Sequence, residues 1–169
     1  MQITECTYTD IPVLLDVYLQ SYREHYPYLW HDGGEGYMQA NFNYTQVENE
    51  MADLNSVFFL LAEEKPVGIV KLNIDKGINH HTAEESLELE RIYFIKGASG
   101  RGLGKETLDF VTEFAKKRSK KYIWLKTMDG SRAFQFYEKQ GFSAIGETLL
   151  TYPNVREEYK KMIIFSKEI

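Results

Sequence analysis

The chain has 169 residues, of which 43% are hydrophobic and 14% aromatic, and this predicts one globular domain over residues 1–169 with a sizeable buried core. No run approaches the ~20 apolar residues of a membrane span, and the N-terminus lacks the pattern of a secretory signal, so we expect a cytoplasmic protein. The single cysteine, Cys6, excludes an internal disulfide framework, and the net charge of −5 disfavours a nucleic-acid surface and suits a cationic small-molecule partner.

The first third of the chain predicts one strand and two helices. Residues 2–8 alternate like a short strand, on which Cys6 would be a small buried hydrophobe. Either residue of the Thr-Asp pair that begins residues 9–26 can cap a helix, and apolar residues follow at helical spacing. A turn-rich aromatic segment at 27–36 leads to a second, less regular helical pattern at 37–54.

Three strands and a helix are predicted in the middle of the chain. The apolar runs 56–64 and 67–75 form a hairpin joined at Glu-Lys-Pro. A polar loop at 76–86 leads to a further strand at 87–95. After the glycine-rich segment 99–105, a helix begins whose apolar residues lie on one face.

The C-terminal third predicts three more strands around one helix. Residues 122–128 form a short apolar strand, and the helix at 131–140 is stopped by Gly141. Strands at 142–147 and 158–167 close the chain. This order of elements implies an α/β fold with a mixed sheet and helices on both of its faces.

The glycine-rich segment SGRGLGK, residues 99–105, has the composition of a phosphate-binding loop but fits neither of the two best-known patterns. A P-loop requires glycine where this chain has Ser99 and a hydroxyl residue where it has Glu106. A dinucleotide-binding pattern requires a third glycine at Lys105 or at Thr107. Both patterns are therefore excluded.

A third pattern does fit, and it resembles the pyrophosphate loop of acyl-CoA-dependent N-acetyltransferases. That loop reads Gln/Arg-x-x-Gly-x-Gly/Ala between a strand and a long helix, and Gly102 and Gly104 match its two small-residue positions. Backbone amides and the helix dipole make such a helix start an anion site, and Arg101 and Lys105 can add charge at its rim. A tight strand-to-helix turn without a ligand is the alternative.

The flanking sequence extends this resemblance to the GNAT superfamily of N-acetyltransferases over residues 58–142. LELERIYFIKGASGRGLGKETLDF resembles the central strand, loop and helix of the family, and SRAFQFYEKQGF resembles its later helix and strand. The bacterial spermidine/spermine N-acetyltransferase branch is the most similar. The family usually has Gln or Arg where this chain has Ser99, and often Asn where it has Gly130, so Asp129 or Ser131 could instead cap the later helix.

The resemblance implies a GNAT-like fold, with a mostly antiparallel mixed sheet of six to seven strands and about four helices. It implies transfer of acetyl from acetyl-CoA, without a metal, to a primary amine, for which a polyamine is the preferred candidate. Two alternatives stay open, namely acetylation of a protein or peptide amine and a non-catalytic CoA-binding regulatory module. Because the family often forms dimers, a homodimer is also possible.

The same resemblance implies roles for individual residues. Glu90 is the first candidate for the general base, with Glu88 on the same strand face as its rival, unless a bulge re-aims them. Tyr137 is the candidate general acid, with a core position as its alternative. A backbone amide within residues 92–94 would bind the oxyanion. The implied cofactor-binding residues are Ile92, Tyr93, Phe94, Ser99, Gly100, Arg101, Gly102, Leu103, Gly104, Lys105 and Ser131.

The N-terminal helices and their loop would form one wall of the amine site. Aromatic and acidic side chains there could bind a cationic chain, although ordinary packing explains most of them equally well. The candidates are Tyr26, Tyr28, Trp30, Asp32 and Glu35. The adjacent His80 and His81 have no other metal-ligand spacing near them, so a solvated loop is expected there.

Overall fold

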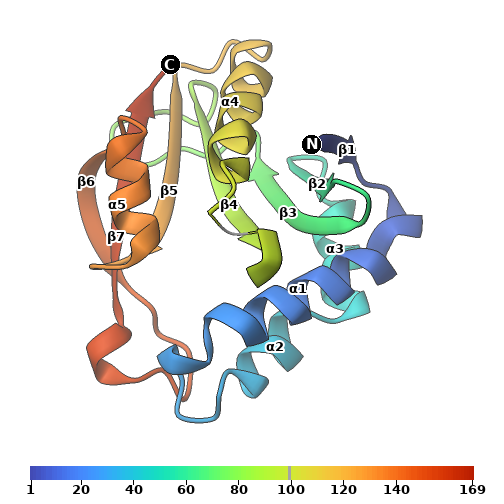
Figure 1. Ribbon diagram of the computed structural model, residues 1–169. Coiled ribbons are helices and arrows are strands. Elements are labelled where there is room, and N and C mark those ends of the chain that lie inside the picture. The colour runs from blue at the N-terminus through green and yellow to red at the C-terminus, as the bar shows by residue number, and fades with distance from the viewer. Residues whose placement is uncertain (99) are drawn as a thin grey trace.

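The computed structural model describes residues 1–98 and 100–169, which form one seven-stranded sheet with helices on both faces (Figure 1). Ser99, predicted to bind the cofactor, lies outside the described residues. The strand order is β1-β2-β3-β4-β5-β7-β6, and among the described strands β4 and β5 are the one parallel pair of neighbours, which confirms the predicted mixed, mostly antiparallel sheet. The strands are β1 (Gln2–Glu5), β2 (Ser56–Ala62), β3 (Pro66–Asn73), β4 (Ser86–Phe94), β5 (Tyr122–Met128), β6 (Ser143–Leu149) and β7 (Lys161–Glu168).

Two hydrophobic clusters, one on each face, hold the helices to the sheet. Helices α4 and α5 pack on one face, and the three N-terminal helices pack on the other. The predicted apolar stripe of α4 is confirmed, since Leu103, Thr107, Val111 and Ala115 are all buried. The helices are α1 (Ile11–His25), α2 (Glu35–Asn41), α3 (Tyr44–Ala52), α4 (Leu103–Lys116) and α5 (Arg132–Lys139).

The second predicted helix is two helices, so the described residues contain five α-helices where about four were expected. The backbone leaves the helical conformation at Phe42, whose ring stacks on Tyr18 with centroids 4.7 Å apart. Asn43 then starts α3, because its side chain accepts a hydrogen bond from the amide of Gln46 (2.9 Å). A packing contact and a cap together interrupt a weak helical pattern.

The prediction for Cys6 is also corrected. Cys6 follows β1 instead of lying within it, and it is half-buried. Its amide still donates to the carbonyl of Phe58 (2.8 Å), which continues the direction of the strand. Desolvation raises the pKa of its thiol to about 12, so the thiol stays protonated at neutral pH.

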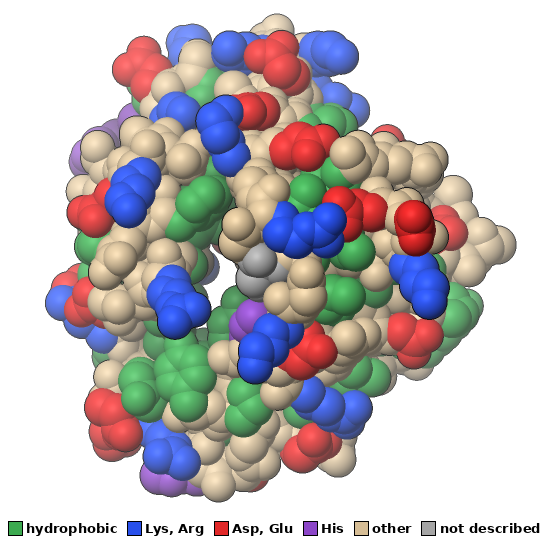
Figure 2. Space-filling model, in the orientation of Figure 1, with side chains coloured by type: hydrophobic (Ala, Val, Ile, Leu, Met, Phe, Trp, Pro, Cys, Tyr) green, Lys and Arg blue, Asp and Glu red, His purple; other side chains and the backbone are tan. Residues whose placement is uncertain are grey.

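Strands β4 and β5 stay together only at their N-terminal ends. They are paired from Ser86–Tyr122 to Glu88–Trp124, after which β4 pairs only with β3, and β5 only with β7. The strands diverge and leave a wedge-shaped gap in the sheet (Figure 1). Figure 2 shows that side chains do not close it, since the surface is open between α5 and the start of α4.

A bulge lies in β4 beside this gap. Lys71 of β3 is opposite Arg91, but the next residue of β3, Leu72, is opposite Leu89. Glu90 is therefore an extra residue without a partner on β3. A bulge of this kind bends a strand and re-aims its side chains.

A substitution at Gly68 of β3 tests whether the stability of the protein depends on the close approach of β3 and β4. A Cβ there would lie 2.6 Å from the carbonyl oxygen of Tyr93, so we expect Gly68→Ala to lower the free energy of unfolding by about 1–3 kcal/mol, as overpacking does. Gly97→Ala is the control, because its Cβ would meet no described heavy atom within 4 Å beyond its chain neighbours. Urea unfolding measures both, and equal stabilities would contradict the prediction.

Candidate active site

The unpaired part of β4 presents backbone hydrogen-bonding groups to the gap. The amide of Ile95 donates to the carbonyl of Val67 (2.9 Å), so it points toward β3. Because successive residues of a strand direct their amides to opposite sides, the amides of Ile92 and Phe94 point into the gap. This edge can therefore receive an extended ligand as it would receive another strand.

Left-handed glycines shape the turn between β4 and α4. Gly100 has φ 77°, and Gly102, the N-cap of α4, has φ 82°. A Cβ at either position would meet no described heavy atom within 4 Å apart from its chain neighbours, so the outer side of this backbone is open. At Gly104 a Cβ would lie 3.3 Å from the ring of Phe136, so glycine there allows α4 to approach α5. The amides at the start of α4 form an accessible anion site.

Both cations of this turn already have acidic partners. Arg101 forms a bidentate ion pair with Glu63, with N···O distances of 2.7 and 2.9 Å, and Lys105 pairs with Asp109 at 2.6 Å. Exposed pairs are weak, so either cation can exchange its partner for a phosphate at small cost. The side chain of Leu103 is buried in the core, so any ligand contact there comes from its backbone.

Helix α5 carries Tyr137 into the core beside the gap. The hydroxyl of Ser131 caps this helix by accepting a hydrogen bond from the amide of Phe134 (3.1 Å), as predicted for the residues before the helix. Tyr137 is 5% exposed, and its ring packs against Phe142. Burial raises the pKa of the Tyr137 phenol well above its ordinary value, and the phenol of Tyr26 adds to this effect. The phenol therefore keeps its proton at neutral pH.

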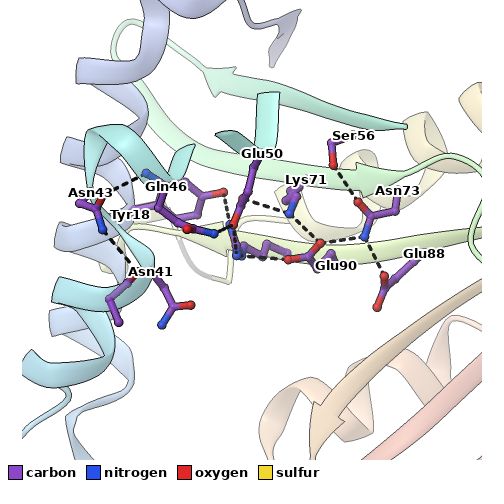
Figure 3. A network of polar contacts seen from close by, with 12 residues as sticks. Tyr18, Asn41, Asn43, Gln46, Glu50, Ser56, Lys71, Asn73, Glu88 and Glu90 are labelled. Carbon is purple, nitrogen blue, oxygen red and sulfur yellow. Dashed lines mark hydrogen bonds and ion pairs between the residues drawn. The ribbon is translucent and has the colours of Figure 1, made fainter. Parts of the chain in front are cut away.

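Glu88 and Glu90 converge on one amide nitrogen. The Nδ2 atom of Asn73 donates to Glu88 at 2.8 Å and to Glu90 at 2.7 Å, so both carboxylates lie on the sheet face covered by the N-terminal helices (Figure 3). Burial and then the charge of Glu90 raise the pKa of Glu88, against the lowering effects of the Asn73 hydrogen bond and of Lys126, 4.0 Å away. The carboxylate of Glu88 is therefore more basic than that of an ordinary glutamate, as a proton acceptor requires.

Glu90 is part of a closed ring of alternating charges. It pairs with Lys71 (2.8 Å) and with Arg91 (3.2 Å), and Glu50 of α3 pairs with the same two cations at 3.0 and 2.7 Å (Figure 3). Glu90 and Arg91 are consecutive, yet their side chains pair with each other on one face of the sheet, which is a direct result of the bulge.

The sequence interpretation did not identify four polar residues of this site, namely Glu50, Lys71, Asn73 and Arg91. Lys71 and Asn73 lie in an apolar strand, where polar residues at alternate positions point to one face. That pattern is the one signal that could have indicated a polar site on this face. Nothing in the pattern of α3 singles out Glu50.

A pocket of about 400 Å³ opens beside the ring, between α3 and the sheet. Its described walls contain carboxylates, amides, two lysines and a serine, and no aromatic or aliphatic side chain. The lining residues are Gln46, Asn49, Glu50, Asp53, Asn55, Ser56, Lys71, Asn73, Lys76 and Glu90.

Two of the N-terminal residues predicted to bind a cation have structural roles instead. Trp30 is buried, and its Nε1 donates to the hydroxyl of Tyr22 (3.0 Å). Asp32 accepts hydrogen bonds from the amides of Gly34 (2.9 Å) and Gly36 (3.1 Å), which lower its pKa and hold the start of α2.

Of the other three, one lies near the proposed acid. Glu35 pairs with Arg23 (3.4 Å) at the surface, and Tyr28 is 46% exposed. The ring of Tyr26 is 5.5 Å from that of Tyr93, and the phenol of Tyr26 contributes to the raised pKa of Tyr137. Tyr26 is therefore the member of the predicted wall that lies against β4.

The two histidines lie away from this site. The ring of His81 stacks on Tyr122 with centroids 3.7 Å apart, at the opposite end of β5 from the gap. The described residues contain no group of three or more His, Cys, Asp or Glu side chains that could hold a metal ion. No helix among them has the length and apolar character to cross a membrane.

Comparison with known proteins gives consistent results. Residues 15–142 match the family model described as the acetyltransferase (GNAT) family. An uncharacterized N-acetyltransferase in the pepI 3′ region of Lactobacillus delbrueckii subsp. lactis is 29% identical over 123 residues, which are 72% of this chain and 71% of that protein.

Two solved structures have a similar fold over almost the whole chain. The PaiA N-acetyltransferase from Thermoplasma acidophilum, in complex with coenzyme A, has a TM-score of 0.77 at 20% identity, with 99% of this chain and 98% of that chain covered. The ribosomal-protein-alanine N-acetyltransferase from Brucella melitensis has a TM-score of 0.71 at 19% identity, with 100% of both chains covered. At these identities the likeness establishes the fold alone.

Proposed function

Since the chain belongs to the GNAT family of acetyltransferases, an acetyl-CoA-dependent class of N-acetyltransferases, we propose that the gap between β4 and β5 binds acetyl-CoA and that Glu88 and Tyr137 move the protons of acetyl transfer. One observation carries this proposal. The pairing of β4 with β5 ends at Glu88, so the open edge of β4 begins at the carboxylate pair and runs toward the start of α4, while α5, which carries the buried phenol, lies against β5.

The cosubstrate would bind along backbone groups more than side chains. The pyrophosphate would accept hydrogen bonds from the amides at the start of α4, and Arg101 and Lys105 would turn to it from their surface partners. The pantetheine arm would pair with the edge of β4, and the amide of Ile92 or Phe94 would bind the developing oxyanion. The coenzyme A complex of the similarly folded PaiA supports this assignment.

The chemical problem of the reaction is the protonation state of the amine. An alkylammonium has a pKa of about 10.4, so forming the nucleophilic amine at pH 7 costs ~4–5 kcal/mol. The ammonium first gives one proton to Glu88, directly or through water, and Glu88 passes this proton to solvent. The nitrogen lone pair then attacks the thioester carbonyl, the C–N bond forms, and the nitrogen gives its second proton to the same carboxylate. Glu90, the first candidate from the sequence, already accepts from Lys71, Arg91 and Asn73, which leaves less of its carboxylate free.

Collapse of the tetrahedral intermediate breaks the C–S bond and releases a thiolate. Tyr137 would donate its phenolic proton to this sulfur, and solvent would return the proton to the phenolate. The raised pKa of Tyr137 keeps the proton in place until the thiolate forms.

The polyamine acceptor predicted from the spermidine/spermine branch is the more specific part of the proposal. Asp53, which lines the pocket beside the charge ring, would receive a second ammonium group of such a molecule. Transfer to a protein or peptide amine is the alternative, and the fold of the Brucella ribosomal-protein-alanine enzyme is compatible with it. The cytoplasmic location and the homodimer also remain predictions.

The proposal is tested by thermal shift with acetyl-CoA and by thiol release with spermidine and with a peptide that has a free N-terminus. We expect acetyl-CoA to raise the melting temperature and spermidine to support thiol release. Absence of the thermal shift would contradict the whole proposal. A shift without thiol release from any amine would indicate the CoA-binding regulatory module instead.

Tyr137→Phe tests the general acid. Removing the phenolic hydroxyl should lower kcat about 100-fold and leave acetyl-CoA binding nearly unchanged, because the ring still fills its place in the core. Tyr44→Phe, at an exposed position on α3, is the matched control and should keep wild-type kcat. A Tyr137→Phe enzyme with wild-type kcat would eliminate this residue as the acid.

Glu88→Gln and Glu90→Gln, compared side by side, identify the base. Glu88→Gln should lower kcat about 100-fold, whereas Glu90→Gln should mainly lower stability, because it breaks the charge ring. Wild-type kcat should also fall on acidification at a higher pH than an ordinary glutamate would produce, since burial raises the pKa of Glu88. If both variants fold and Glu90→Gln lowers kcat more than Glu88→Gln does, Glu90 is the general base instead.

A further inference from the structure

The bulge in β4 places the side chains of two consecutive charged residues, Glu90 and Arg91, on the same face of the sheet. Their directions there must be fixed by contacts with other residues. Arg91 is 8% exposed and Glu90 is 26% exposed. An extra residue interrupts the backbone ladder between β3 and β4, so the ladder alone does not fix the direction of Glu90. Side-chain contacts must determine it.

Those contacts come from a different part of the chain. Glu50 of α3 binds Arg91 through both of its oxygens (2.7 and 3.0 Å) and Lys71 through one of them (3.0 Å). Its side chain is 11% exposed, and Gln46 one turn earlier donates a further hydrogen bond to it (3.0 Å). Glu50 is therefore anchored within α3 as well as to the sheet.

We propose that Glu50 is a positioning residue for acetyl transfer, which holds the β4 bulge through Lys71 and Arg91 and so sets the Glu88–Asn73–Glu90 group in its reactive arrangement. The inference rests on the proposed function, because it acts through carboxylates to which that function assigns the amine proton. It also links the N-terminal helices to the chemistry, although none of their carboxylates touches the reacting atoms.

The physical reason is charge balance in a confined space. With Glu50 present, two carboxylates share two cations. Without its charge, Lys71 and Arg91 are left with Glu90 alone, which draws Glu90 toward them and away from Asn73 and leaves one excess positive charge beside Glu88.

Excess positive charge favours the ionised form of a nearby carboxylate, so Glu88 would release its proton at lower pH and become a weaker base. The other charged or titratable groups that face the carboxylate pair come from several elements and stay in place. They are Tyr18 of α1, Tyr37 of α2, Lys76 after β3, and Lys126 of β5.

The test compares Glu50→Gln with Glu48→Gln, an exposed position on the same helix that does not line the pocket. Glu50→Gln should lower kcat about tenfold or more, with acetyl-CoA affinity unchanged, and move the acidic limb of the kcat–pH profile to lower pH. If Glu50 contributed to stability alone, its substitution would lower the melting temperature and leave the acidic limb of the kcat–pH profile unchanged. Glu48→Gln should match the wild type in both.

A second variant and a second measurement keep the inference testable. Glu50→Gln with Lys71→Met removes one charge of each sign, so it should fold and return the acidic limb toward the wild-type position. Carboxyl ¹³C NMR titration follows Glu88 without any turnover, and its midpoint should move to lower pH in Glu50→Gln. An unchanged midpoint together with an unchanged kcat would overturn the role of Glu50. A wild type without thiol release would overturn the proposed function, and the NMR result would still decide the role of Glu50.

Discussion

The parallel pairing of β4 with β5 ends at Glu88 and Trp124, and the organisation of the site follows from the place where it ends. Beyond that point the backbone of β4 has β3 on one side and open space on the other. Unpaired strand edges are usually covered in folded proteins, because they attract other chains. Here the exposed segment is short and lies inside the sheet, so an extended small molecule can reach it more readily than another strand.

The bulge in β4 adds the chemistry to this edge. It places Glu90 and Arg91 on the face that already carries Glu88, in the partly buried space beneath α3. Charges in such a place are stable only when each has a partner, and the ring of two carboxylates and two cations supplies one for every member. A carboxylate with a raised pKa can then lie beside the ring without unfolding the sheet.

The aromatic residues of the N-terminal helices form a packed layer beside the charge ring, where the guanidinium of Arg91 lies 5.6 Å from the ring of Tyr18 and 5.9 Å from that of Phe42. Tyr22 stacks on Tyr37 with centroids 5.1 Å apart, and Tyr37 stacks on Trp30 at 4.9 Å. Such contacts stabilise a helical layer through both buried area and ring geometry. Of the three aromatic residues that resembled a cation-binding wall in the sequence, Trp30 is therefore a packing residue, whereas Tyr28 is exposed and Tyr26, which follows α1, lies against Tyr93 of β4.

The sequence alone predicts the features that depend on residues close together in the chain. The glycine spacing predicted the turn before α4, the apolar stripe predicted its buried face, and alternation predicted the strands and the shared face of Glu88 and Glu90. The division between α2 and α3 was missed, because the break depends on Phe42 stacking against another helix. The same limit applies to Glu50, Lys71 and Arg91, which come from α3, β3 and β4 and meet only when α3 lies on the sheet. Local order is encoded in short-range patterns, whereas the partners of a buried charge are decided by which distant segments the fold brings together.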